Sequence, residues 1–199
     1  MLETIHAASQ RDELDRARAQ EYALLARLLA RSPDAALIQR LAQLGGDATP
    51  LGLAHAALGQ AAARASAEQV EREYVDLFAG LGQNGLFPYA SHYRAGALYG
   101  RPLADLRDEL RRLGIEGATT SEPEDHVATL LEIMAGLAGG EIGATPGTDR
   151  QFFQQHLAPW IGRFFADLAR VTSAEFYACV GTLGGIFIEI ETEAFTLPG

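Results

Sequence analysis

The residues Glu122-Pro123-Glu124-Asp125-His126 place three carboxyl groups, a proline and an imidazole directly before an apolar run. Carboxylates accept paired hydrogen bonds from arginine, and an imidazole beside them can bind a partner or move a proton. Ser121 precedes Glu124 by three residues, which is the spacing of a capping box, and proline fits the first turn of a helix. The pattern therefore predicts a helix that begins at this cluster, with its charged residues at a polar boundary between loop and core.

A second polar segment, Pro88-Tyr89-Ala90-Ser91-His92-Tyr93, contains a serine next to a histidine. Neighbours in sequence seldom point at one another, and no Gly-x-Ser-x-Gly turn surrounds Ser91, so the segment does not predict a nucleophile with its base. Two interpretations stay open. In one, Ser91 caps a short helix while Tyr89 and Tyr93 pack half-buried with wet hydroxyl groups; in the other, the segment lines a binding groove.

The sequence gives little support for metal or nucleotide chemistry. No two of its five histidines are four residues apart, which is the spacing of a helical metal site, and Cys179 is the only cysteine. The chain contains no lysine, so it has no Gly-x-x-x-x-Gly-Lys-Ser/Thr phosphate loop. We therefore expect no catalytic residue, no metal site and no bound cofactor.

The elements that must position these residues are predicted to be helices, because helix caps recur along the chain and no segment alternates with period two. The expected fold is an all-α bundle of about eight to ten helices. Helix starts, stops or breaks are expected at Ser9 with Asp12, Ser32-Pro33, Gly45-Gly46, Thr49-Pro50, Ser66 with Gln69, Pro102, Gly114, Pro159 and Thr172 with Glu175, with a short helix over 91–99.

Apolar residues at helical spacing define the predicted core. Tyr74, Phe78 and Trp160 lie on such stripes and are interpreted as core rather than site residues. The inward-facing set is expected to include Leu14, Tyr22, Leu25, Leu29, Val70, Leu77, Leu81, Leu103, Leu106, Leu110, Leu113, Val127, Leu130, Leu131, Met134, Leu137, Phe153, Leu157, Phe164, Leu168, Phe176, Val180, Leu183, Phe187 and Ile190.

Composition narrows the class of partner and compartment. A formal net charge of −10 disfavours nucleic acid, whose phosphates would be repelled, and favours a cationic partner. The N-terminus lacks the basic start and apolar run of a signal peptide, and no stretch reaches the roughly eighteen apolar residues of a membrane span, so stable membrane insertion is not expected. The single Cys179 also fits a reducing compartment, and the predicted location is cytoplasmic.

Four stretches together resemble the TorD/DmsD/NarJ family of redox-enzyme maturation chaperones, in the family's order. They are Glu-Pro-x-Asp-His at 122–126, Tyr-Val-Asp-Leu-Phe-Ala-Gly at 74–80, the segment 88–93, and Phe-Phe-Gln-Gln-His-Leu-Ala-Pro-Trp at 152–160. The likeness covers roughly residues 70 to 165. It implies two helical subdomains, 1–114 and 127–199, joined by a hinge over 115–126.

The resemblance also implies a function. Such a protein would be a cytoplasmic chaperone that binds the apo form and the twin-arginine signal peptide of a molybdenum-cofactor oxidoreductase, assisting cofactor insertion and delaying export. Relatives exchange domains about the hinge, so a domain-swapped homodimer is compatible with the linker. The residues to which the family's peptide-binding role carries over are Glu122, Pro123, Asp125, His126, Tyr89, Ser91 and Tyr93.

Two alternatives from other classes remain at this point. A small helical hydrolase could use Asp125 and His126 as an acid-base pair, although the sequence supplies neither a nucleophile nor a metal for it. A helical regulator that only mediates protein contacts would share the fold class but would be indifferent to signal peptides. The sequence does not specify which oxidoreductase is the client.

Overall fold

The computed structural model describes residues 2–79, 85–115 and 122–197, with side chains described from residue 12 onward. These residues form helices, and the extended backbone within them makes a single isolated bridge rather than a sheet, which confirms the all-α prediction. The elements are α1 (Leu2–Ala30), α2 (Ala35–Leu41), α3 (Pro50–Arg64), α4 (Ala67–Phe78), α5 (Ala90–Ala95), α6 (Arg101–Arg112), α7 (Val127–Ala138), α8 (Thr148–Phe152), the π-helical turn η1 (Phe153–Leu157), α9 (Ile161–Ala169) and α10 (Glu175–Thr196).

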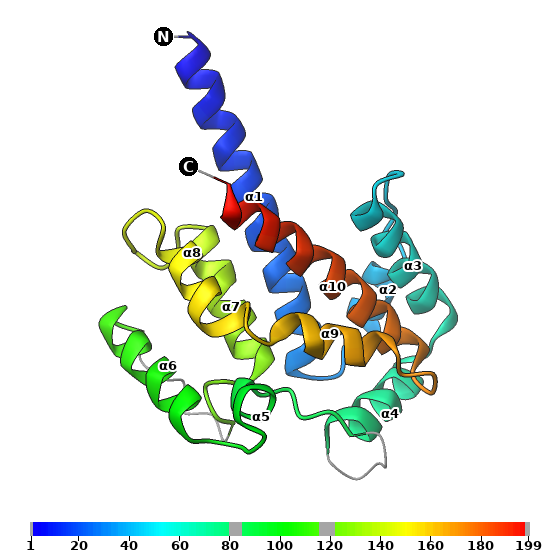
Figure 1. Ribbon diagram of the computed structural model, residues 1–199. Helices are drawn as coiled ribbons and strands as arrows, with labels where there is room; N and C mark the ends of the chain where they lie inside the picture. The colour runs from blue at the N-terminus through cyan, green and yellow to red at the C-terminus, as the bar shows by residue number, and fades with distance from the viewer. Residues whose placement is uncertain (1, 80–84, 116–121, 198–199) are drawn as a thin grey trace.

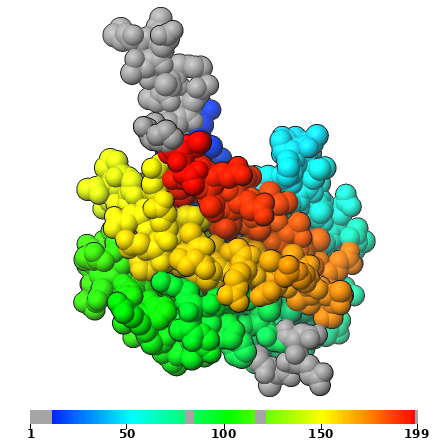
Figure 2. All heavy atoms as spheres, viewed as in Figure 1, coloured from blue at the N-terminus to red at the C-terminus, as the bar shows by residue number. Residues whose placement is uncertain are grey.

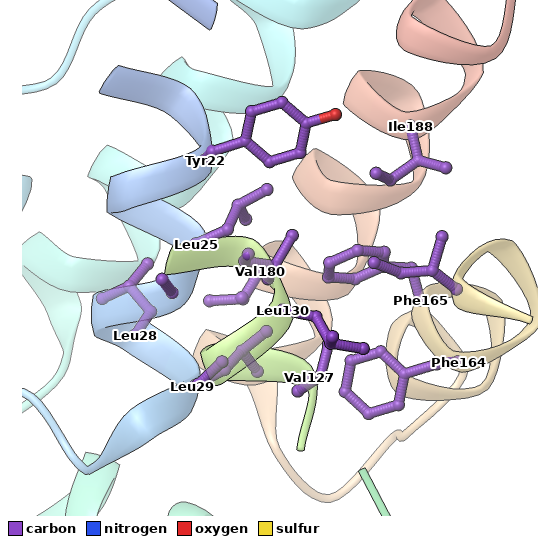
Figure 3. Close-up of a cluster of buried hydrophobic side chains, with 14 of the residues drawn as sticks. Tyr22, Leu25, Leu28, Leu29, Val127, Leu130, Phe164, Phe165, Val180 and Ile188 are labelled. Atoms are coloured by element: carbon purple, nitrogen blue, oxygen red, sulfur yellow. The ribbon is translucent and has the colours of Figure 1, made fainter. Parts of the chain in front are cut away.

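Helix packing joins the two ends of the chain. Helix α1 packs along α7, and α10 packs against both α3 and α9, while the N-terminal end of α1 projects beyond the other helices (Figure 1). Side chains from α1, α7, α9 and α10 converge in one apolar cluster that includes Tyr22, Leu25, Val127, Phe164 and Val180 (Figure 3). Because helices from both sides of residues 115–126 share this core, the division into two subdomains stays a prediction.

Most described members of the predicted apolar stripes are buried or half-buried, and two of them are exposed, while Leu81 lies outside the described residues. Leu14 is 61% exposed and Ile190 is 44% exposed, so both expectations were wrong. Helix α1 starts at Leu2 rather than near Ser9 and extends past the helices that cover its C-terminal half (Figure 1). Helical spacing alone cannot show where along a long helix the covering partners end.

Several helix ends agree with the sequence. The Thr49 hydroxyl accepts the Gly52 N–H at 3.1 Å, Ser66 and Gln69 form the predicted capping box, and Gly114 ends the region of α6 with a φ of +68°. The chain also breaks at Pro159, which separates η1 from α9. The short helix α5 was placed correctly but spans only Ala90–Ala95 rather than 91–99.

Two predicted caps were wrong because another acceptor takes their place. Asp34, not Ser32, caps α2 by accepting the Leu37 N–H at 2.8 Å. Thr172 does not cap α10; instead the Glu73 carboxyl group on α4 accepts the Tyr177 N–H at 3.1 Å and faces the Phe176 N–H at 3.5 Å. A carboxylate suits the positive end of a helix, but this one is about a hundred residues away in sequence and no local pattern reveals it.

Glycines set the close approach of α9 and α10. A Cβ atom at Gly184 would lie 2.2 Å from the Phe165 ring, and one at Gly181 would lie 2.4 Å from the Ala169 backbone nitrogen. Phe165 is fully buried, so a methyl group at Gly184 would press directly on a packed ring. The two helices can pack at this distance only because both positions lack side chains. Within the described parts of the chain, no helix is long and apolar enough to cross a membrane.

We expect Gly184→Ala to lower the free energy of unfolding by about 1–3 kcal/mol, because its methyl group would overpack against Phe165. Gly185→Ala is the matched control, since a Cβ there meets its nearest atom at an ordinary 3.9 Å. The control should be neutral or gain up to about 1 kcal/mol from helix propensity. Urea unfolding of both variants measures the difference, and equal midpoints would contradict this account of the packing.

Candidate functional site

The two polar segments singled out in the sequence meet at one junction, at the starts of α5 and α7. Tyr89 and His126 form an antiparallel bridge, the Val127 N–H donates to the Pro88 carbonyl at 2.8 Å, and the Ala90 N–H donates to the Asp125 carbonyl at 3.0 Å. These bonds satisfy backbone groups that a helix start leaves without intrahelical partners. The bonded residues are more than thirty positions apart in sequence, so only the fold brings them together.

Asp125 is the centre of this junction. Its side chain is fully buried, and Oδ2 accepts the Ser91 N–H of α5 at 2.8 Å. Ser91 is also fully buried, and its hydroxyl accepts the Tyr99 N–H at 3.1 Å instead of capping α5. Asp125 therefore does for α5 what Ser91 was expected to do. Asp125 lies at the expected boundary between loop and helix, but it is buried there, because the crossing of the two segments encloses it.

His126 is the N-cap residue of α7. The helix begins at Val127, and His126 Nδ1 accepts the Ala128 N–H at 3.2 Å. The ring also packs edge-on against Tyr89, with centroids 5.2 Å apart. Burial lowers the pKa of His126, while Glu122 and Asp125 act in the opposite direction. A neutral ring with its proton on Nε2 is the form that can accept at Nδ1.

The predicted capping box at Ser121 and Glu124 is not how α7 starts, and Ser121 itself lies outside the described residues. Glu124 instead pairs with Arg107 of α6 through two-pronged contacts of 2.8–3.0 Å, which lower the pKa of its carboxyl group. Pro123 precedes the helix, and its carbonyl accepts the His126 N–H at 3.1 Å. Arg107 was missed because nothing in the spacing of α6 marks it apart from other surface arginines.

The outer side of the junction carries the groups that solvent can reach. Glu122 is exposed and accepts a hydrogen bond from the half-buried Tyr89 hydroxyl, and burial together with this contact raises the pKa of Tyr89. Phe87 is 45% exposed and stacks at 5.0 Å on the His92 ring. Phe87 carried no motif in the sequence, and its exposure is the only sign of a surface role.

Tyr93 makes a different contact from the other predicted site residues. Its hydroxyl donates to Asp167 of α9 at 3.1 Å, and its ring lies 5.5 Å from that of Trp160. The Arg163 guanidinium group stands 5.6 Å above the same ring. Tyr93 thus ties α5 to α9, while Tyr89, Ser91, Glu122, Pro123, Asp125 and His126 gather at the junction of α5 and α7.

The aromatic residues interpreted as core do pack there. Trp160 is 1% exposed and donates its indole N–H to the His156 carbonyl at 2.7 Å. Tyr74 and Phe78 are half-buried against Tyr177, and the Tyr74 hydroxyl bonds the Ala30 carbonyl at 3.1 Å. They support α4, α9 and α10 rather than the junction.

The geometry gives no support to acid-base catalysis by Asp125 and His126. The first binds a backbone N–H of α5 and the second binds a backbone N–H of α7, so both side chains hold helix starts in place. Among residues whose positions are described, no group of three or more His, Cys, Asp and Glu side chains is arranged to hold a metal ion. The arrangement is that of a rigid polar joint with an exposed carboxylate and aromatic rim.

Comparison with known proteins relates this helical fold to a family. The chain shares its fold with a solved structure described as a redox enzyme maturation protein from Archaeoglobus fulgidus, with a TM-score of 0.55 over 88% of this chain and 93% of that one, at 17% identity. The model of the nitrate reductase delta subunit family matches residues 44–166. The chain belongs to this family.

Curated relatives agree with this assignment. The chain is 26% identical over 136 residues to the chaperone protein TorD of Vibrio atlanticus, covering 63% of each chain. It is 27% identical over 131 residues to TorD of Vibrio cholerae, covering 61% of this chain and 60% of the relative. The chain thus spans a little under two thirds of the length of these relatives.

Removing the Asp125 carboxyl group should destabilise the fold. Asp125→Ala leaves the fully buried Ser91 N–H without its acceptor, which costs about 1–3 kcal/mol. Asp125→Asn is the matched control, because its amide oxygen can still accept that N–H, and it should lose less. Urea unfolding gives both values. An Asp125→Ala protein as stable as wild type would show that the junction does not depend on this bond.

Because its pKa is lowered in the folded protein, His126 makes the stability of the fold depend on pH in a predictable direction. In the folded protein, His126 binds a proton less readily than it does in the unfolded chain, where its pKa is near the ordinary value of about 6.5. The contribution of His126 to stability is therefore complete above about pH 6.5 and is lost as pH falls from there toward the lower folded-state pKa.

His126→Asn tests this, since asparagine can cap α7 without titrating. Its melting temperature should fall less than that of wild type between about pH 7 and 5.5. Glu21, whose pKa burial raises, contributes the opposite sign in both proteins, so the difference between them reports His126. Parallel pH profiles would contradict the assignment.

Proposed function

We propose that this protein is a cytoplasmic chaperone for the maturation of a redox enzyme. It would hold the apo form of a molybdenum-cofactor oxidoreductase and bind its twin-arginine signal peptide, so that export is delayed until the cofactor is inserted. The observation that carries the proposal is that the junction of segments 88–93 and 122–126 lies inside the region that matches the family model. Both the curated relatives and the solved structure carry names that fit this role.

The junction supports a division of labour among the predicted peptide-binding residues. Glu122 and Pro123, with the ring of Tyr89, face outward and would contact a bound peptide. Asp125, Ser91 and His126 are enclosed and would act by holding that surface in shape. Tyr93 would transmit the position of α5 to α9 through Asp167.

The charge of the chain supports a cationic client segment. With a net charge of −10, the surface field attracts arginines over a distance that salt screens, about 10 Å at 0.1 M. Two guanidinium groups beside an apolar run supply both a charge for the exposed carboxylates and a surface to bury. A regulator that only mediates protein contacts would not distinguish such a peptide from others.

The proposal keeps the two subdomains, 1–114 and 127–199, with a hinge at 115–126. The packing of α1 on α7 crosses that hinge, so two chains could exchange the same contacts in a swapped homodimer. Sedimentation at several concentrations distinguishes a monomer from such a dimer.

A capped peptide with two arginines and an apolar run should bind the purified protein more tightly than its twin-lysine version. The guanidinium fork matches a carboxylate where an ammonium offers a point charge, so we expect roughly a threefold to tenfold difference by calorimetry. Glu122→Gln should reduce that difference. Glu132→Gln, an exposed change on α7 with the same loss of charge, should leave it intact.

Equal affinity for the two peptides would remove arginine recognition from the proposal. The chaperone role is tested separately, by capture of the native oxidoreductase from cytoplasm on the immobilised protein. If only the mature, cofactor-loaded enzyme were captured, the proposed role would be wrong.

A further inference from the structure

A groove of about 520 Å³ runs between α9 and α10, away from the junction of α5 and α7. The two helices lie side by side (Figure 1), and their orange and red side chains share one face of the molecule (Figure 2). Phe165 and Ala166 line the groove from α9, and Ile186 and Ile188 line it from α10. The volume is that of a typical ligand cleft and suits several apolar side chains.

Two glycines border this groove at positions where the packing of the helices does not require glycine. A Cβ atom at Gly162 would meet nothing within 4 Å, and one at Gly185 would meet only the Phe165 Cβ at an ordinary 3.9 Å. Gly181 and Gly184 differ, because the approach of the helices requires them. Glycine in a helix interior is unfavourable relative to alanine, so the presence of Gly185 in the middle of α10 is not explained by stability, while Gly162 lies in the first turn of α9.

The polar groups along the groove leave its floor apolar. The hydroxyl groups of Thr182 and Thr192 donate to carbonyls of their own helix, Ala178 at 3.0 Å and Ile188 at 2.7 Å. The charged residues that line the groove are Glu189 and Glu193, both exposed, and neither forms an ion pair with any residue in the described part of the chain. Their i, i+4 spacing places their Cβ atoms about 5–6 Å apart on one side of α10.

The acidic residues at the junction of α5 and α7 already accept hydrogen bonds within the fold. Glu124 is paired with Arg107, Asp125 binds the Ser91 N–H inside the fold, and Glu122 accepts from Tyr89. An arginine that approached Glu124 or Asp125 would compete with existing bonds, whereas the exposed Glu122 carboxylate can accept a further hydrogen bond beside the one from Tyr89. At the α9–α10 groove, an arginine would meet two exposed carboxylates, those of Glu189 and Glu193, beside an apolar surface. Such a surface complements an apolar segment flanked by arginines.

We propose that the α9–α10 groove is a docking site for an apolar segment flanked by arginines, with the apolar side chains over Gly162 and Gly185 and the guanidinium groups at Glu189 and Glu193. The client signal peptide is such a segment, and in naming it as the natural occupant the proposal rests on the proposed function. It adds a binding surface on α9 and α10 to the one at the junction.

The probe is a capped peptide of two arginines followed by leucines and alanines, labelled for fluorescence anisotropy. Gly185→Leu places a side chain in the groove at a position where its Cβ meets the nearest atom at an ordinary 3.9 Å, and we expect at least a tenfold loss of affinity with a melting temperature like that of wild type. Gly45→Leu is the matched control, since that exposed glycine of the α2–α3 loop also has open space around it and should bind like wild type.

The role of charge is tested with the double variant Glu189→Gln and Glu193→Gln. It should bind the peptide severalfold more weakly than wild type at low salt, and its affinity should depend less on salt. Glu68→Gln with Glu71→Gln removes the same charge from exposed positions of α4 and should do neither. A peptide that binds Gly185→Leu as tightly as wild type, or that does not bind wild type, overturns the groove proposal.

Two further outcomes separate this site from the proposed function and from a rival occupant. If Gly185→Leu loses the probe but still captures the apo oxidoreductase, the groove binds such segments yet the client does not use it, and the client part of the proposal fails. If sedimentation shows that wild type dimerises and Gly185→Leu does not, a second copy of the chain occupies the groove and the proposal is wrong.

Discussion

The Asp125 carboxyl group, enclosed by two crossing segments and bonded to the Ser91 N–H, is the contact on which the arrangement of α5 and α7 depends. A buried polar group is costly unless it is hydrogen-bonded, and so is a buried backbone N–H. The Ser91 N–H and the Asp125 Oδ2 atom satisfy each other, while the buried Oδ1 atom of Asp125 has no hydrogen-bond partner among the described residues. With the Val127 and Ala90 backbone bonds, the pair fixes the angle at which two helices leave one joint.

This use of Asp125 and His126 changes what the polar motif at residues 122–126 can do. Both side chains are buried and hydrogen-bonded to N–H groups at helix starts, which leaves them poorly placed for proton transfer. Recognition is left to the rim, where Glu122, Tyr89 and Phe87 are accessible. The buried residues of the joint thus hold the backbone in place, and the exposed residues of the rim are available for binding.

Helix α9 links that joint to the rest of the molecule. One side of it receives the Tyr93 hydroxyl at Asp167, and another packs on α10 through Gly181 and Gly184. The packing is tight where these glycines are required and open where Gly162 and Gly185 are not. A single helix therefore borders both surfaces to which we assign client contacts.

The sequence by itself determined the helical class, most helix positions, the buried stripes and the two motifs of the site, because helical spacing, local caps and proline breaks act within a few residues. It did not determine that Asp125 caps α5, that Glu73 caps α10, or that Glu124 binds Arg107. Leu14 and Ile190 matched their stripes and still lie open. Only the tertiary structure decided these points, because each depends on which distant helix covers a residue or supplies its hydrogen-bond partner, and no local spacing records that choice.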